Sequence, residues 1–141
     1  MKQKRVLTAE EKKHLIERIT AILRAKEYIL FAYIFGSFIS GENFNDIDVG
    51  IFISGEKPES FLTLELEMER ELGDALHIPV DVRIINTAPP SFTYNVLKSG
   101  VVILDNDKSL RTEFEGLICK KYFDYKHLRN EYLREIINAS V

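Results

Sequence analysis

Two apolar runs joined by a short polar segment decide the fold of this chain, and they lie in residues 28–53, YILFAYIFGSFISGENFNDIDVGIFI. The first run, residues 28–35, is rich in aromatic and β-branched residues and ends at Gly36, which is typical of a buried strand. The second run, residues 46–53, is apolar apart from Asp46 and Asp48, which predicts another buried strand. The stretch therefore predicts two core strands whose connection carries polar residues.

The sequence on either side predicts helices and two further strands. Thr8 and Glu11 have the spacing of a capping box, and apolar residues at helical spacing follow, so we expect a helix over about residues 9–26. Near the C-terminus the helical pattern passes Asp124, where the helix either continues or breaks. The other expected elements are a helix at 59–74, a strand at 79–85, a helix between Pro89 and Gly100, a strand at 101–104 and a C-terminal helical segment at about 106–137.

The order of these elements predicts the fold class. Helices and strands alternate along the chain, which favours an α/β architecture with a mixed sheet of about four strands flanked by helices. The chain has 141 residues, of which 45% are hydrophobic and 29% charged, the size and balance of one globular domain. We therefore expect a single domain over residues 1–141.

Cysteine content and hydropathy indicate the cellular compartment. The lone Cys119 excludes an internal disulfide framework and fits a reducing environment. The N-terminal residues lack the pattern of a signal peptide, and no apolar run is long enough to cross a membrane as a helix. We expect a cytoplasmic protein without membrane association.

Charge is unevenly distributed along the chain. Residues 28–106 hold four basic and twelve acidic side chains, which makes a poor surface for a nucleic-acid backbone and a suitable one for cations. A solvated acidic helix at about 65–74 accounts for much of this charge. It does not account for Asp46, Asp48 and Asp81, which lie at or within predicted strands.

These carboxylates and a glycine-serine pair are the candidate site residues. Gly36 and Ser37 follow a buried strand directly, and free N–H groups at a helix start favour an anion such as phosphate. Asp46 and Asp48 are two apart on a strand, so their side chains point to the same face. Such a carboxylate pair selects Mg²⁺ or Mn²⁺. Asp81 lies in an apolar strand, where an acid is paired, binds a metal or faces water at the edge of the sheet.

Together these motifs resemble the nucleotidyltransferase superfamily that includes DNA polymerase beta, and within it the minimal MNT-type enzymes. The resemblance covers roughly residues 30–135. It is carried by Phe35-Gly36-Ser37-Phe38, by Gly41, by Asp46-Ile47-Asp48-Val49 and by Asp81 in Val80-Asp81-Val82.

The resemblance implies the nucleotidyltransferase fold and transfer of a nucleoside monophosphate from a triphosphate to a hydroxyl, with pyrophosphate leaving. In that family Asp46, Asp48 and Asp81 would be the catalytic, Mg²⁺-binding residues, with Asp81 receiving the acceptor proton. Gly36 and Ser37 would bind the phosphates of ATP. Small MNT proteins resemble the antitoxins of HEPN/MNT modules, in which the MNT protein adenylylates a tyrosine of its HEPN ribonuclease partner. We therefore expect a HEPN-family toxin as partner and no direct nucleic-acid binding.

Two alternatives remain open at this point. The connection between Ser37 and Asp46 is shorter than in the usual family pattern, and Asn45 replaces the common serine. A non-catalytic antitoxin that acts by binding alone is therefore the second hypothesis. The third is an adenylyltransferase that modifies a small-molecule hydroxyl. The aromatic residues Tyr122 and Tyr132 in the last helix belong either to the core or to a partner interface.

Overall fold

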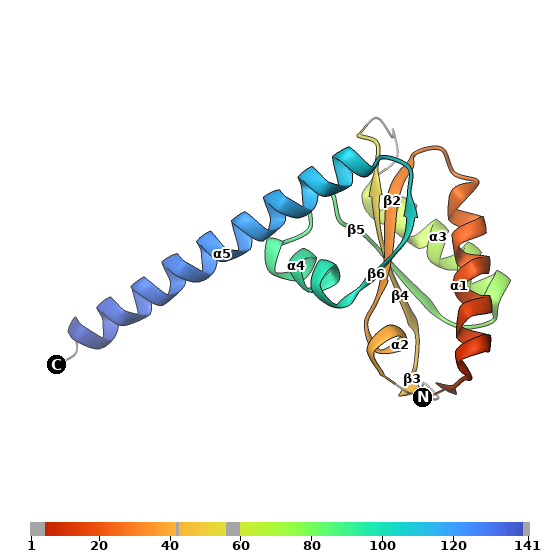
Figure 1. Ribbon diagram of the computed structural model, residues 1–141, viewed down its shortest axis with the longest axis horizontal. Helices are drawn as coiled ribbons and strands as arrows, with labels where there is room; N and C mark the ends of the chain where they lie inside the picture. The colour runs from red at the N-terminus through yellow and green to blue at the C-terminus, as the bar shows by residue number, and fades with distance from the viewer. Residues whose placement is uncertain (1–4, 42, 56–59, 140–141) are drawn as a thin grey trace.

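A mixed four-stranded sheet forms the centre of the protein in a computed structural model that describes residues 5–41, 43–55 and 60–139. Its strand order is β5-β4-β2-β6 (Figure 1). β2 (Ile29–Phe35) pairs antiparallel with β4 (Ile47–Ile53) and with β6 (Val101–Asp105), and β4 pairs parallel with β5 (Val80–Ile84). The predicted α/β class and mixed sheet are confirmed.

Helices cover both faces of this sheet. α1 and α3 pack with the first face around a core that includes Ile34, Val49 and Val82, whereas α4 and the start of α5 cover the second face around Phe31 and Tyr33. Adjacent residues of a strand point to opposite faces of the sheet. Since Val49 is buried in the core of the first face, the preceding Asp48 lies on the second face. The helices are α1 (Ala9–Arg24), α2 (Ser37–Ser40), α3 (Phe61–Leu76), α4 (Pro90–Ser99) and α5 (Lys108–Ala139).

Some element boundaries differ from the sequence expectations. The helix expected at 59–74 is observed as α3, and its expected first residue lies outside the described residues. α5 continues without a break past Asp124. The sequence reasoning missed a small antiparallel ribbon between β1 (Arg5–Val6) and β3 (Asn43–Phe44), because strands of two residues carry no periodic signal.

The acidic helix α3 closes the open edge of β5. Glu69 accepts a hydrogen bond from the Val82 backbone N–H at 2.8 Å, and Glu65 accepts one from the Ile84 N–H at 2.8 Å. An uncovered edge strand would offer these N–H groups to another chain. The interpretation of this helix as merely solvated is therefore wrong for Glu65 and Glu69, whose carboxylates have a structural role.

We expect Glu69→Ala to lower the free energy of unfolding by about 1–3 kcal/mol, because it leaves the N–H of the buried Val82 without its acceptor. Glu69→Gln keeps an acceptor oxygen and should lose less. Urea denaturation of both variants measures the difference, with the exposed Glu67→Ala on the same helix as control. Equal stability of the Glu69→Ala and Glu67→Ala variants would contradict the assignment.

Helix α5 packs on the body with its first half only. Phe114 and Ile118 are buried against the sheet, and Tyr122 stacks on Tyr94 of α4 at 4.0 Å between ring centroids. The ring of Phe123 also lies edge to face with that of Tyr94, at 5.6 Å between centroids, and beyond it the helix projects away from the body (Figure 1). The exposed large apolar residues from this position onward are Phe123, Tyr125, Leu128, Tyr132, Leu133, Ile136 and Ile137.

Within the described residues, no helix combines the length and the apolar character needed to cross a membrane.

Candidate active site

Three carboxylates meet at one end of the sheet. Asp48 lies on β4 directly opposite Asp81 on the parallel strand β5, and Asp46 precedes the first residue of β4. One oxygen from each of the three lies within 4.8 Å of the others. Asp46 and Asp48 are half-buried and Asp81 is exposed. The structure thus brings together the three aspartates that the sequence singled out.

This arrangement suits a hard divalent cation. Three negative charges at such short range repel one another unless a cation or a proton lies among them. Oxygens that bind one Mg²⁺ at about 2.1 Å can lie up to about 4.2 Å apart. The observed spacing therefore accommodates one cation after a small side-chain adjustment, or two neighbouring cations. The donor set, carboxylate oxygen alone, is the one that Mg²⁺ and Mn²⁺ prefer.

Gly36 brings the backbone against this cluster. It follows the last residue of β2, Phe35, which pairs with Asp48 across the ladder. The φ of Gly36 is 78°, in the region that favours glycine, and a Cβ there would lie 2.2 Å from Oδ2 of Asp48. Only glycine fits this position, so α2, which starts at the exposed Ser37, begins beside the carboxylates.

A cavity of about 320 Å³ opens next to Asp48 and Asp81. Phe35, Phe92 and Arg83 supply most of its remaining wall, with the two phenyl rings edge to face at 5.7 Å. The guanidinium carbon of Arg83 lies 4.7 Å from the centroid of the Phe92 ring. A planar or hydroxyl-bearing group could therefore pack on aromatic surface within reach of Asp81.

The sequence reasoning did not identify these cavity residues. Arg83 is two residues beyond Asp81 on β5, so strand alternation alone could have placed it on the same face. Phe92 lies on α4, and no sequence signal connects it with Asp81. The other lining residue, Glu69, is already engaged by the Val82 N–H.

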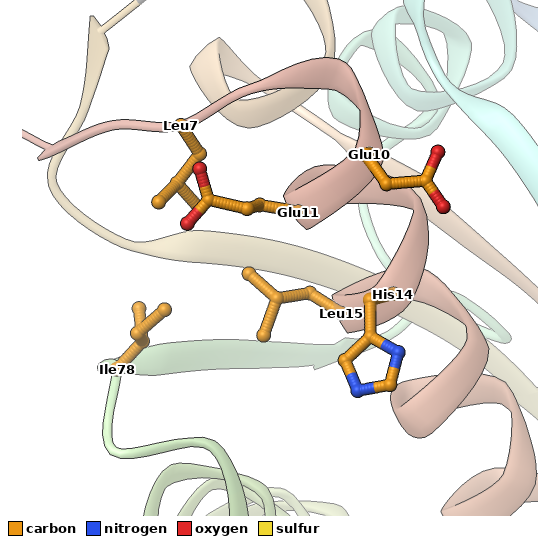
Figure 2. A pocket seen from close by; sticks show the side chains of 6 residues that line it. All are labelled: Leu7, Glu10, Glu11, His14, Leu15 and Ile78. Atoms are coloured by element: carbon orange, nitrogen blue, oxygen red, sulfur yellow. The ribbon is translucent and has the colours of Figure 1, made fainter.

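A second pocket, of about 390 Å³, lies at the start of α1 and contains none of the predicted site residues. Its apolar wall comes from Leu7, Leu15 and Ile78 (Figure 2). Glu11 at its rim accepts a hydrogen bond from the Thr8 N–H, so its carboxylate serves the helix cap. This pocket is therefore separate from the three aspartates and their neighbouring cavity.

Chains in several solved toxin–antitoxin structures have the same fold as this chain. An MNT antitoxin in complex with the tri-AMPylated HEPN toxin of Shewanella oneidensis aligns with a TM-score of 0.70 and 17% identity, covering 89% of this chain and 98% of that one. A chain of a mutant MntA-HpeT toxin–antitoxin complex aligns with a TM-score of 0.71 and 20% identity, covering 86% and 96%. A chain of a toxin–antitoxin structure with AMP-PNP gives 0.66 and 17%, covering 92% and 99%.

At these identities the likeness establishes the fold. No curated protein matches the sequence. The family model described as "Polymerase beta, Nucleotidyltransferase" matches residues 17–109, which include all three aspartates, Gly36 and Ser37. The resemblance seen in the sequence is thereby confirmed: the chain belongs to the polymerase beta nucleotidyltransferase family.

Proposed function

We propose that this protein is a Mg²⁺-dependent adenylyltransferase antitoxin that transfers AMP from ATP to a tyrosine hydroxyl of a HEPN-type ribonuclease toxin. The observation that carries the proposal is the meeting of Asp46, Asp48 and Asp81 beside the glycine that starts α2, in a chain of this family. The shorter connection between Ser37 and Asp46 still allows Asp46 to join the cluster. This favours catalysis over inhibition by binding alone.

The reaction breaks a phosphoanhydride bond of ATP and forms a phosphoester bond to the acceptor hydroxyl. The acceptor oxygen forms a bond to the α-phosphorus of ATP, the bond from that phosphorus to the bridging oxygen breaks, and pyrophosphate leaves. A bound Mg²⁺ supplies charge neutralisation at the phosphate oxygens. Asp46 and Asp48 would hold it with Asp81.

The remaining roles follow from exposure and position. Asp81 is the most exposed of the three aspartates and lines the cavity, so it is placed to take the proton of the acceptor hydroxyl. Gly36, which has no side chain to obstruct close approach, and the Ser37 hydroxyl would bind the β- and γ-phosphates. The Phe35 and Phe92 rings would contact the acceptor side chain.

Two observations support ATP and a protein acceptor. Among the structural neighbours, one was solved with AMP-PNP and another with a tri-AMPylated HEPN toxin. The exposed apolar residues of α5 also form a surface of the kind that marks a protein interface. Tyr125, Leu128 and Tyr132 recur at spacings of three and four, so they share one helix face.

The direct test is to incubate the protein with Mg²⁺, ATP and a HEPN-type protein with which it forms a complex. Intact-mass and peptide mass spectrometry should show AMP on a tyrosine of the partner, and the partner's tyrosine-to-phenylalanine variant should remain unmodified. A toxin that is inhibited without gaining AMP would support the binding-only alternative. Transfer to a small-molecule hydroxyl alone would support the third.

The apolar face of α5 gives a separate prediction about the partner. We expect Leu128→Glu or Tyr132→Glu to weaken the complex with the HEPN-type protein by more than about tenfold, because a buried unpaired charge is costly at an interface. Asn130→Glu is the matched control, because residue 130 points away from the face shared by residues 128 and 132. Size-exclusion chromatography and calorimetry measure the change. Equal loss in all three variants would contradict a role for this face.

A further inference from the structure

The N-terminal part of α1 reaches the connection between Gly36 and Asp46. The Lys12 ammonium donates hydrogen bonds to the backbone carbonyls of Phe38, at 3.1 Å, and Gly41, at 3.0 Å. It also lies 5.5 Å from the centroid of the Phe38 ring and 5.9 Å from that of Phe44. The half-buried Lys12 side chain therefore contacts both the C-terminal end of α2 and the strand β3 that follows it.

The segment before α1 contacts the other end of the same connection. Nη1 of Arg5 donates to the carbonyl of Asn45 at 2.7 Å, directly before Asp46. Arg5 also pairs with Phe44 in the β1–β3 ribbon. Figure 1 shows the described start of the chain lying beside β3 and α2.

The connection needs such external contacts because α2 is only one turn long. Its internal bonds include Ser40 N–H to Gly36 O at 3.0 Å and Gly41 N–H to Ser37 O at 2.9 Å. An isolated turn is unstable in water, and the last carbonyls of a helix require donors from elsewhere. A cation at a helix C-terminus is also electrostatically favourable. Lys12 supplies both the donors and the charge.

Residues 5–16 lie outside the part of the chain that matches the family model, residues 17–109. Lys12 and Arg5 therefore lie N-terminal to the matched residues, and both contact the connection that joins Gly36 to Asp46. Lys12, outside the match, supplies the side-chain donor to both Phe38 O and Gly41 O.

We propose that Lys12 is a positioning residue for nucleotide binding. By holding the end of α2, it keeps Gly36 against Asp48 and keeps Ser37 where the triphosphate binds. The role in nucleotide binding rests on the proposed function, whereas the role in ordering α2 does not depend on it. Lys12 is not among the residues that line the cavity beside Asp48 and Asp81.

The test compares Lys12→Met, Lys12→Arg and Lys13→Met in the full chain. Methionine keeps the apolar stem and removes the donors and the charge, arginine can donate to both carbonyls, and the exposed Lys13 is the adjacent control. Hydrogen exchange of the Ser40 and Gly41 amides, measured without nucleotide, reports the order of α2. Calorimetry with Mg²⁺ and ATP reports nucleotide affinity.

In Lys12→Met we expect amide exchange at Ser40 and Gly41 to accelerate about tenfold. The Kd for Mg²⁺–ATP should rise about tenfold. The melting temperature should change by less than about 4 °C. Lys12→Arg should restore most of both losses, and Lys13→Met should match the wild type. Unchanged exchange or unchanged affinity in Lys12→Met overturns the proposal, and so does a failure of arginine to restore either.

These readouts separate the inference from the proposed function. A wild-type protein that binds no Mg²⁺–ATP contradicts the proposed function, and with it the role of Lys12 in nucleotide binding. Amide exchange then still decides whether Lys12 orders α2. A wild type that binds Mg²⁺–ATP and a Lys12→Met variant that binds it equally well contradict the inference alone.

Discussion

Replacing Asp46 and Asp48 together by asparagine is expected to abolish detectable Mg²⁺-dependent ATP binding and to reduce AMP transfer on the order of 10³-fold or more. The reason is that the double variant loses two of the three carboxylates whose oxygens lie within 4.8 Å of one another. Charge stabilisation by a bound metal contributes several kcal/mol to such a transition state, and each 1.36 kcal/mol is about tenfold in rate. Calorimetric titration of Mg²⁺ with ATP and a transfer assay measure the two effects.

The same double variant provides its own control for folding. Without metal, a cooperative thermal unfolding transition of the double variant would show that it is folded. Adding Mg²⁺ should raise the melting temperature of the wild type but not of the variant, since a ligand stabilises only a protein that binds it. Asp74→Asn, at an exposed position of α3, should behave as wild type in every assay. Mg²⁺–ATP binding that survives in the double variant would show that the cluster is not the metal site.

The second large effect is expected for Gly36→Ala. An alanine at φ 78° adopts a strained backbone that costs about 1–3 kcal/mol, and its Cβ would lie 2.2 Å from Oδ2 of Asp48. The contact can be relieved only by moving the carboxylate or the start of α2, and either movement disturbs the proposed site. We therefore expect reduced stability in urea denaturation and a loss of Mg²⁺–ATP affinity greater than about tenfold.

The matched control is Gly116→Ala in α5. A Cβ at Gly116 meets no atom within 4 Å, and alanine is favoured over glycine inside a helix by about 1 kcal/mol. The control should therefore gain stability and keep its Mg²⁺–ATP affinity. If Gly36→Ala bound nucleotide as tightly as Gly116→Ala, the close approach of Gly36 to Asp48 would have no role in the site.

Much of the fold could be predicted because its signals are local. The capping box of Thr8 and Glu11 marks the start of α1, and the apolar runs on either side of Gly36 correspond to β2 and β4. The ribbon between Arg5 and Phe44 could not be predicted, since strands of two residues that lie far apart in sequence carry no periodic signal.

The role of the acidic helix shows a similar limit. Composition predicts that α3 is a solvated helix, and Glu67 on it is indeed exposed. The neighbouring Glu65 and Glu69 bind the N–H groups of β5 instead, because α3 packs along that edge of the sheet. Periodicity locates a helix face, but the partner of that face depends on the topology of the whole domain.

The family, the order of the main elements and the residue types of the proposed site could be inferred from the chain alone, because motif spacing and strand alternation are properties of neighbouring residues. That Asp81 lies opposite Asp48 became known from the folded protein, because it depends on the register of two strands separated by α3. Packing also brings Phe92 of α4 to the wall of the cavity and Lys12 of α1 to Gly41. Contacts between distant residues follow from the assembled sheet and helices, so no local pattern in the chain encodes them.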